Sequence, residues 1–169
     1  MKGGKYLLLV LFPLALQTVV FPRLSLFGAV PNLILLITIC YGLLEGIRPG
    51  LYLGLLGGLS LDLAGSGILG INIIALGVLG SGAGYLEKIV VKGYLLVPLC
   101  LVQLGTVLAE LFSYCILRAF GWRIDFLSFL GSTLLPSCLY HLILTGPVYY
   151  GVKKGLTYLG VRPKVGASR

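Results

Sequence analysis

The residues best suited to chemistry in this sequence are Glu110 and His141, an acid and a base that stand within long apolar segments. Each belongs to a stripe of polar residues that recurs every three or four positions, the spacing that places side chains on one face of a helix. The two stripes consist of Gln103, Thr106, Glu110 and Ser113 in one segment, and of Thr133, Ser137, His141 and Thr145 in the other. If the two helices pack antiparallel, Glu110 and His141 can pair. Such a pair could relay protons, line a pocket for a small ligand or hold two helices together.

A second candidate site is a stripe of small residues that ends in an acid. Gly50, Gly54, Gly58 and Asp62 recur every four residues in an otherwise apolar segment. On a helix, this spacing forms a line without side chains along which another helix can approach closely. The carboxylate must find a partner, and the following turn, Asn72 or a basic residue could supply one. We interpret the set as the seam of a helical hairpin and as a partner interface, with the members Gly50, Gly54, Gly58, Asp62, Gly70 and Asn72.

The remaining reactive residues argue against catalysis. The chain has one His, and it contains neither a phosphate-binding loop nor a cluster with metal-ligand spacing. Its four cysteines fall within apolar segments without a Cys-x-x-Cys motif, so we infer neither a disulfide nor a metal site. We therefore predict that the protein is not an enzyme and uses no cofactor. For Glu110 and His141 we favour an interhelical or partner contact over transport, because one acid and one His make a short relay.

The composition indicates that these residues are positioned by helices in a membrane. Hydrophobic residues make up 58% of the 169 positions and charged residues only 11%, whereas soluble proteins carry about 25% charged residues. The mean hydropathy is +1.05. A globule of this size could not bury so many apolar side chains, because small domains keep much of their surface exposed. The lipid bilayer is therefore the expected solvent.

Six apolar segments, separated by charges and by Pro or Gly, are candidate transmembrane spans. A spanning helix needs about 20 apolar residues, and shorter segments can tilt or lie shielded by neighbouring protein. The spans are approximately 6–21, 31–45, 49–63, 68–86, 93–117 and 126–152. They predict an all-α integral membrane protein, a six-helix bundle in which residues 1–169 form a single polytopic domain. The third and fourth helices are expected to be short and rich in glycine.

The distribution of charge predicts the orientation of the chain. A net charge of +8 could suggest a nucleic-acid partner. However, six spans leave only Arg23, Arg118 and Arg123 of the 13 basic residues on one side. This bias follows the positive-inside rule and places both termini in the cytoplasm. We therefore expect no nucleic-acid partner, although the basic tail that begins at Lys153 could hold anionic lipid.

Several short motifs occur in an order that resembles a known family. They are LQT at 16–18, PRLSLFG at 22–28, VPNL at 30–33, GGLSLDL at 57–63 and LGIN at 69–72. Their order resembles that of the bacterial rod shape-determining protein MreD. The motifs cover the first four helices, and the last two spans match in hydropathy alone. The family often carries Asp where this chain has Asn32, so a role for a charge at that position would not transfer.

The resemblance implies a non-catalytic scaffold in the bacterial inner membrane. Such a protein would bind the bitopic protein MreC and help to couple MreB filaments to the elongation-complex synthases that make peptidoglycan, and so to cell shape. It could also form homo-oligomers. The fold would be similar to the six-helix substrate-binding subunits of energy-coupling-factor transporters, which supplies an alternative function, a vitamin-like solute-binding subunit. A membrane enzyme or lipid carrier acting on wall precursors is a further alternative.

Overall fold

Six helices make up the part of the chain that the structure, a computed structural model, describes: residues 3–19, 30–65, 68–88 and 95–158. Five of them are α1 (Gly3–Val19), α2 (Leu33–Glu45), α3 (Ile47–Ala64), α4 (Ile71–Leu86) and α5 (Leu96–Ala119). The sixth is continuous and consists of α6 (Phe126–Phe129), the π-helical segment η2 (Leu130–Leu134) and α7 (Leu135–Tyr158). The prediction of an all-helical chain with six helices is confirmed.

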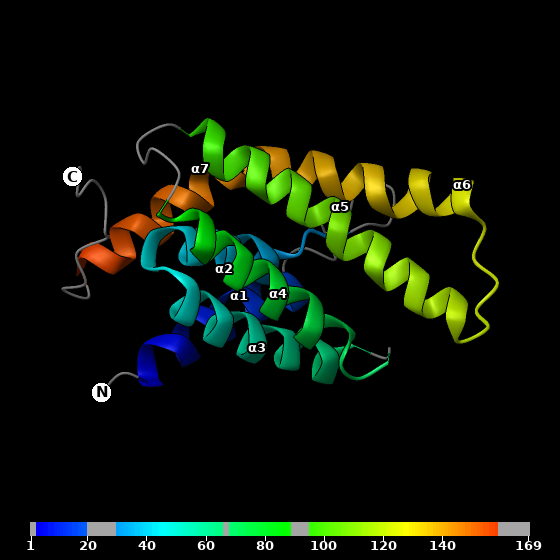
Figure 1. Cartoon of the computed structure of the whole chain (residues 1–169), viewed down its shortest axis with the longest axis horizontal. Helices are drawn as coiled ribbons and strands as arrows, with labels where there is room; N and C mark the ends of the chain where they lie inside the picture. Colours follow the sequence, from blue (N-terminus) through cyan, green and yellow to red (C-terminus); the bar gives the residue numbers. More distant parts are fainter. Residues whose placement is uncertain (1–2, 20–29, 66–67, 89–94, 159–169) are drawn as a thin grey trace.

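Two helices are much longer than the others. Leu96–Ala119 has 24 residues and Phe126–Tyr158 has 33, and both are long and apolar enough to cross a membrane. At about 1.5 Å per residue they measure about 36 and 50 Å, compared with about 30 Å for the hydrocarbon core. They form a hairpin that extends past the ends of α1 to α4 (Figure 1). The bundle therefore has a long side, formed by the hairpin Leu96–Tyr158, and a short side, formed by α1 to α4.

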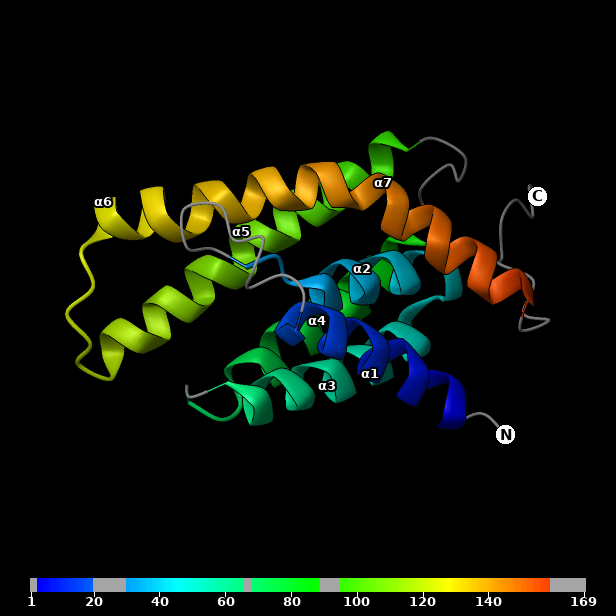
Figure 2. The ribbon, with the colours of Figure 1, turned by 180° about the vertical axis from the view of Figure 1, so that it is seen from behind.

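Helix α2 occupies the centre of the bundle. Its sequence is apolar on all sides, which is typical of a helix that is buried all round. Almost every residue from Leu33 to Leu44 is buried, and α1, α3, α4, α5 and α7 all pack against it. Figure 2 shows α2 between α1 and α7. The free backbone N–H groups at its first turn must therefore be satisfied from inside the protein.

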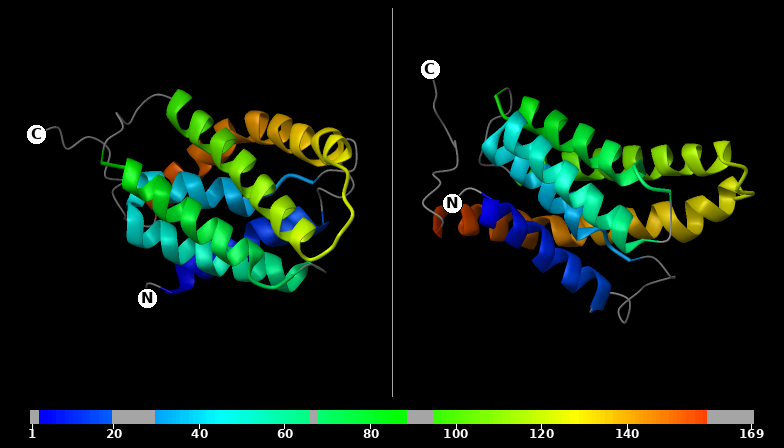
Figure 3. Two further views of the ribbon diagram at one scale, coloured as in Figure 1. Left: turned by 45° about the vertical axis from the view of Figure 1, so that its right-hand side comes forward. Right: turned by 90° about the horizontal axis from the view of Figure 1, so that it is seen from below.

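Helices α3 and α4 form the most extensively packed pair and lie side by side (Figure 3). The chain enters α3 from α2 through Gly46 alone, whose φ of 100° lies in the left-handed region that glycine adopts without strain. This tight turn returns α3 along α2. As a result, α2, α3 and α4 form a three-helix unit, against which the long hairpin and α1 pack.

Candidate functional site

The glycine stripe of α3 lies directly against the backbone of α4. A Cβ atom added to Gly50, Gly54 or Gly58 would lie within 3.0 Å of backbone atoms of Gly80, Leu76 and Asn72, in that order. Real Cβ atoms essentially never approach so closely, so even alanine would force the two helices apart. The stripe is therefore occupied within the chain and is not an open surface for a partner.

The seam also includes the central helix. A Cβ added to Gly42 of α2 would lie 2.5 Å from the Gly80 carbonyl oxygen, and one added to Gly50 would lie 2.9 Å from the Gly42 Cα atom. Three backbones thus meet at Gly42, Gly50 and Gly80. In lipid no hydrophobic driving force holds helices together, so membrane helices associate through van der Waals contacts of this close kind. We call these glycines, together with Gly54 and Gly58, the glycine seam.

Asp62 closes one end of this seam as a cap on α4. It is 6% exposed. Its Oδ2 accepts hydrogen bonds from the backbone N–H groups of Gly70 at 2.8 Å and Ile73 at 3.2 Å. Its Oδ1 accepts two from Asn72, from the backbone at 3.1 Å and from the side-chain amide at 2.8 Å. The carboxylate thus satisfies the first turn of the next helix, whose partial positive charge favours an anion.

His141 performs a similar task at the first turn of the buried helix α2. The Asn32 backbone N–H donates to His141 Nε2 at 3.0 Å, across 109 positions of sequence. Gln17 of α1 accepts from the Leu33 N–H at 3.0 Å, and the Asn32 side chain accepts from the Leu35 N–H at 3.0 Å. Side chains from α1 and α7, together with Asn32 itself, therefore hold the start of α2. We call this group the α2 clamp.

The hydrogen bonds of the clamp fix the tautomer of His141, which is 1% exposed. A backbone N–H can only donate, so Nε2 must accept from Asn32 and carry no proton. The proton then lies on Nδ1, which is 2.6 Å from Thr106 Oγ1, and the Thr106 hydroxyl donates to the Val102 carbonyl at 2.8 Å. Every donor in this chain of bonds meets an acceptor. His141 is therefore a neutral structural group in this arrangement.

Glu110 and His141 do not bond to each other. Both ring nitrogens of His141 have other partners, and Glu110 accepts a long hydrogen bond of 3.4 Å from the Ser137 hydroxyl. About two turns before Glu110 on α5, the Gln103 amide donates to the Cys138 carbonyl at 3.1 Å. The polar stripes of α5 and α7 do face each other. Their hydrogen bonds are separate links between the two helices and do not connect with one another. We find no continuous relay among these described side chains.

Comparison with known proteins places the sequence of this chain in a family. The family model for the rod shape-determining protein MreD matches residues 5–158. The chain belongs to the MreD family. The match covers the long hairpin as well as the first four helices, where the recognisable motifs lie. No curated protein and no solved structure matches the chain.

Membership of the MreD family establishes the broad role of the protein. It is a non-catalytic membrane protein of rod-shape determination and a component of the elongation machinery. The buried polar groups agree with this role, because Asp62 and His141 are engaged in holding helix ends. Neither presents a free group to a substrate in this arrangement.

Sequence reasoning missed the contributions of Gln17 and Asn32 to the α2 clamp, and the contact between Thr106 and His141. Asn32 carried a usable signal, since Asn directly before a run of apolar residues is a typical helix N-cap. Gln17 had no such signal, because its partner lies on another helix.

An apolar groove follows the outer face of this MreD-family bundle between α4 and α5. It combines two adjoining hollows of about 300 and 230 Å³ that share Val78, Leu79 and Leu108. The lining extends along α4 from Ile74 to Leu86, which is nearly the whole helix. Small side chains form part of the wall: Ala75, Gly82, Ala83, Gly105 and Ala109. We call this hollow the α4/α5 groove.

Proposed function

We propose that this protein is a membrane scaffold of the elongation complex and that its α4/α5 groove holds the single transmembrane helix of an MreC-like bitopic partner. The observation that carries the proposal is the shape of this groove. It is apolar, runs nearly the full length of α4 and is lined in part by small residues. Membrane helices associate by close packing on such surfaces, because lipid is as apolar as the helices themselves.

The glycine seam also favours this proposal, because it packs α4, one wall of the groove, firmly against α3. Helix α4 forms one wall, and its position is set by backbone contact with α3 and by the Asp62 cap at its first turn. Because this wall is already fixed, the protein loses less conformational entropy when a partner helix binds, which favours specific association. In this proposal the residues Gly50, Gly54, Gly58, Asp62, Gly70 and Asn72 shape the partner surface without touching the partner.

The wider assembly is part of the same proposal. Bound MreC would connect this chain to MreB filaments and to the peptidoglycan synthases, directly or indirectly, with both termini of the chain in the cytoplasm. The six-helix arrangement would be related in fold to the substrate-binding subunits of energy-coupling-factor transporters. Residues 1–169 would act as a single membrane domain.

Filling the groove tests the proposal. A Cβ added to Gly82 would meet no described atom within 4 Å, and Gly82 lines the groove, so Gly82→Leu projects a side chain into it. We expect co-purification with an MreC-like partner to fall about tenfold or more, as for a loss of about 1.4 kcal/mol at a binding hot spot. Gly131→Leu is the matched control, because Gly131 also has open space around it but lies outside the groove. A folded Gly82→Leu protein that retains its partner at the wild-type level would refute the proposed location.

The solute-binding alternative rests on a small, mainly apolar hollow at the Asp62 end of the bundle that also contains a few polar side chains. It measures about 150 Å³, and its lining includes Asp62, Asn72 and Ser113. The Asp62 oxygens already accept four hydrogen bonds, one of them from the Asn72 side chain, which leaves them little capacity for a ligand. A thermal-shift screen with vitamins tests this alternative, and a specific increase in melting temperature would favour it over the scaffold.

A further inference from the structure

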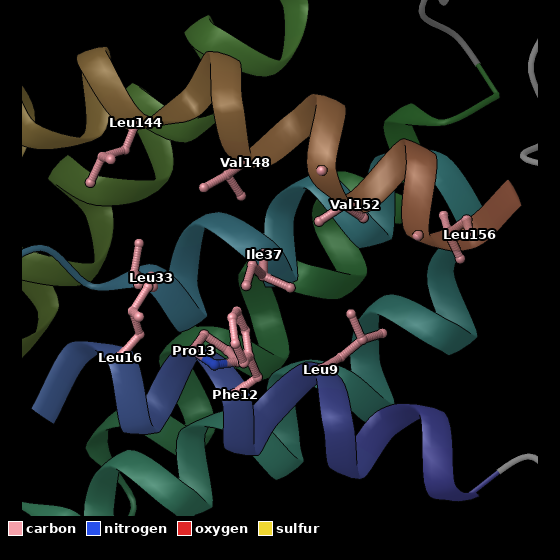
Figure 4. Close-up of a pocket in the computed structure, with 12 residues that line it drawn as sticks. Leu9, Phe12, Pro13, Leu16, Leu33, Ile37, Leu144, Val148, Val152 and Leu156 are labelled. Carbon is pink, nitrogen blue, oxygen red and sulfur yellow. The ribbon is translucent and has the colours of Figure 1, made fainter. Parts of the chain in front are cut away.

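A second apolar groove lies on the opposite side of α2, between α1 and α7. Figure 4 shows side chains from both helices around it, including Leu9 and Phe12 of α1 and Val148 of α7, with Leu33 and Ile37 of α2 as its floor. The volume is about 390 Å³, and every lining side chain is apolar. A polar ligand would find no hydrogen-bond partner among these side chains, so the occupant must present hydrocarbon.

The groove contains two glycines that packing within the described chain does not explain. Gly151 and Gly155 lie one turn apart on α7 and both line the groove. A Cβ added to either would meet no described atom within 4 Å, whereas a Cβ on a glycine of the seam would collide with a neighbouring backbone. Glycine weakens a helix relative to alanine. Their presence keeps space open beside α7 that no described residue fills.

A charged side chain next to the groove indicates the kind of molecule that it would bind. Lys154 directly precedes the groove residue Gly155 and is exposed, and the exposed Tyr158 lies about one turn further along α7. With Thr157 they line a hollow of about 310 Å³. The Thr157 hydroxyl donates to the Lys153 carbonyl, which leaves the Lys154 ammonium and the Tyr158 hydroxyl as donors. An anionic oxygen is the group that matches these donors.

The length of the groove also favours a lipid. Along α7 the lining extends from Leu144 to Leu156, about 18 Å at 1.5 Å per residue. One leaflet of the hydrocarbon core measures about 15 Å, half of the total. The groove therefore covers about one leaflet, and it lies in the C-terminal half of the helix Phe126–Tyr158.

We propose that the α1/α7 groove binds an anionic phospholipid of the inner leaflet, with an acyl chain against Gly151 and Gly155 and the head-group phosphate at Lys154. The inner-leaflet assignment rests on the proposed orientation of the termini. The site is separate from the α4/α5 groove, so the lipid and a partner helix can bind together. The lipid would fill the space between α1 and α7 and fix α1 on the bundle.

Native mass spectrometry of the purified full chain with added phosphatidylglycerol or phosphatidylethanolamine tests the site. We expect the wild-type protein to retain phosphatidylglycerol preferentially. Lys154→Gln should weaken retention about fivefold, equivalent to about 1 kcal/mol for one basic residue at an anionic surface. Gly155→Leu should abolish it by filling the groove. Arg118→Gln and Gly131→Leu are the controls, since neither residue lines this groove, and both should retain the lipid.

Two outcomes would overturn the lipid site. The first is equal retention of the two lipids by the wild-type protein, and the second is undiminished phosphatidylglycerol binding by Gly155→Leu. If this second outcome is accompanied by loss of an MreC-like partner, the groove belongs to a partner helix instead. Loss of lipid only from Gly155→Leu, together with loss of the partner only from Gly82→Leu, would support the lipid site and the scaffold function independently.

Discussion

Replacing Asp62 by Asn provides the sharpest test of the view that this acid is an architectural cap. Asn keeps one acceptor oxygen, but its amide nitrogen would face the N–H groups that now donate to Oδ2, those of Gly70 and Ile73. Two hydrogen bonds to a charged group are then lost. At about 1.5 kcal/mol each, the free energy of unfolding should fall by about 3 kcal/mol.

Asp125→Asn is a matched control for this substitution. Asp125 also caps a helix, accepting from the Ser128 backbone N–H at 3.1 Å and from its hydroxyl at 3.3 Å, but in an exposed setting. Asn and Asp are about equally good N-caps, so the exposed substitution should cost only a few tenths of a kcal/mol. Unfolding of both variants in detergent micelles, followed by circular dichroism, measures the difference. Equal stability of the two variants would refute the assigned role of Asp62.

Three further substitutions test the seam and the buried polar groups. Gly54→Leu should prevent folding or extraction as a monodisperse protein, because its side chain would collide with the α4 backbone, whereas Gly82→Leu should be extracted normally; size-exclusion chromatography distinguishes them. His141→Ala should lower the free energy of unfolding by about 2 kcal/mol or more, because it leaves the Asn32 N–H unpaired and opens a cavity; a relay function would instead leave stability unchanged. Thr38→Val should stabilise the protein by about 1 kcal/mol, since the buried Thr38 hydroxyl has no hydrogen-bond partner among the residues that the structure describes; a destabilised variant would show that this hydroxyl is satisfied.

The number of helices could be predicted from the sequence because charges and Pro or Gly breaks separate the apolar segments so clearly. The central position of α2 could not be read from order along the chain. Its signal was weaker: the segment 33–45 is apolar on every face, but in a membrane protein lipid can cover such a helix as readily as protein can. Only the packing of five other helices around it distinguishes the two cases.

The polar residues show a similar limit. Spacing assigned Glu110 and His141 to helix faces, but it could not show which group each face meets. His141 reaches the start of α2, 109 positions away, instead of Glu110. Asp62 was more accessible to sequence reasoning, because Gly70 and Asn72 lie within ten residues and a turn must bring them back. Local partners could therefore be anticipated, whereas partners on distant helices could not.

Site-specific crosslinking in native membranes tests the central proposal most directly. A photo-crosslinking amino acid at Val78 would lie in the α4/α5 groove, and one at Ile143 would lie on an exposed part of α7 that lines neither groove. We expect the Val78 probe to form a covalent adduct with an MreC-like bitopic protein and the Ile143 probe to form none. An adduct from Ile143, with none from Val78, would contradict the scaffold surface proposed for this MreD-family protein.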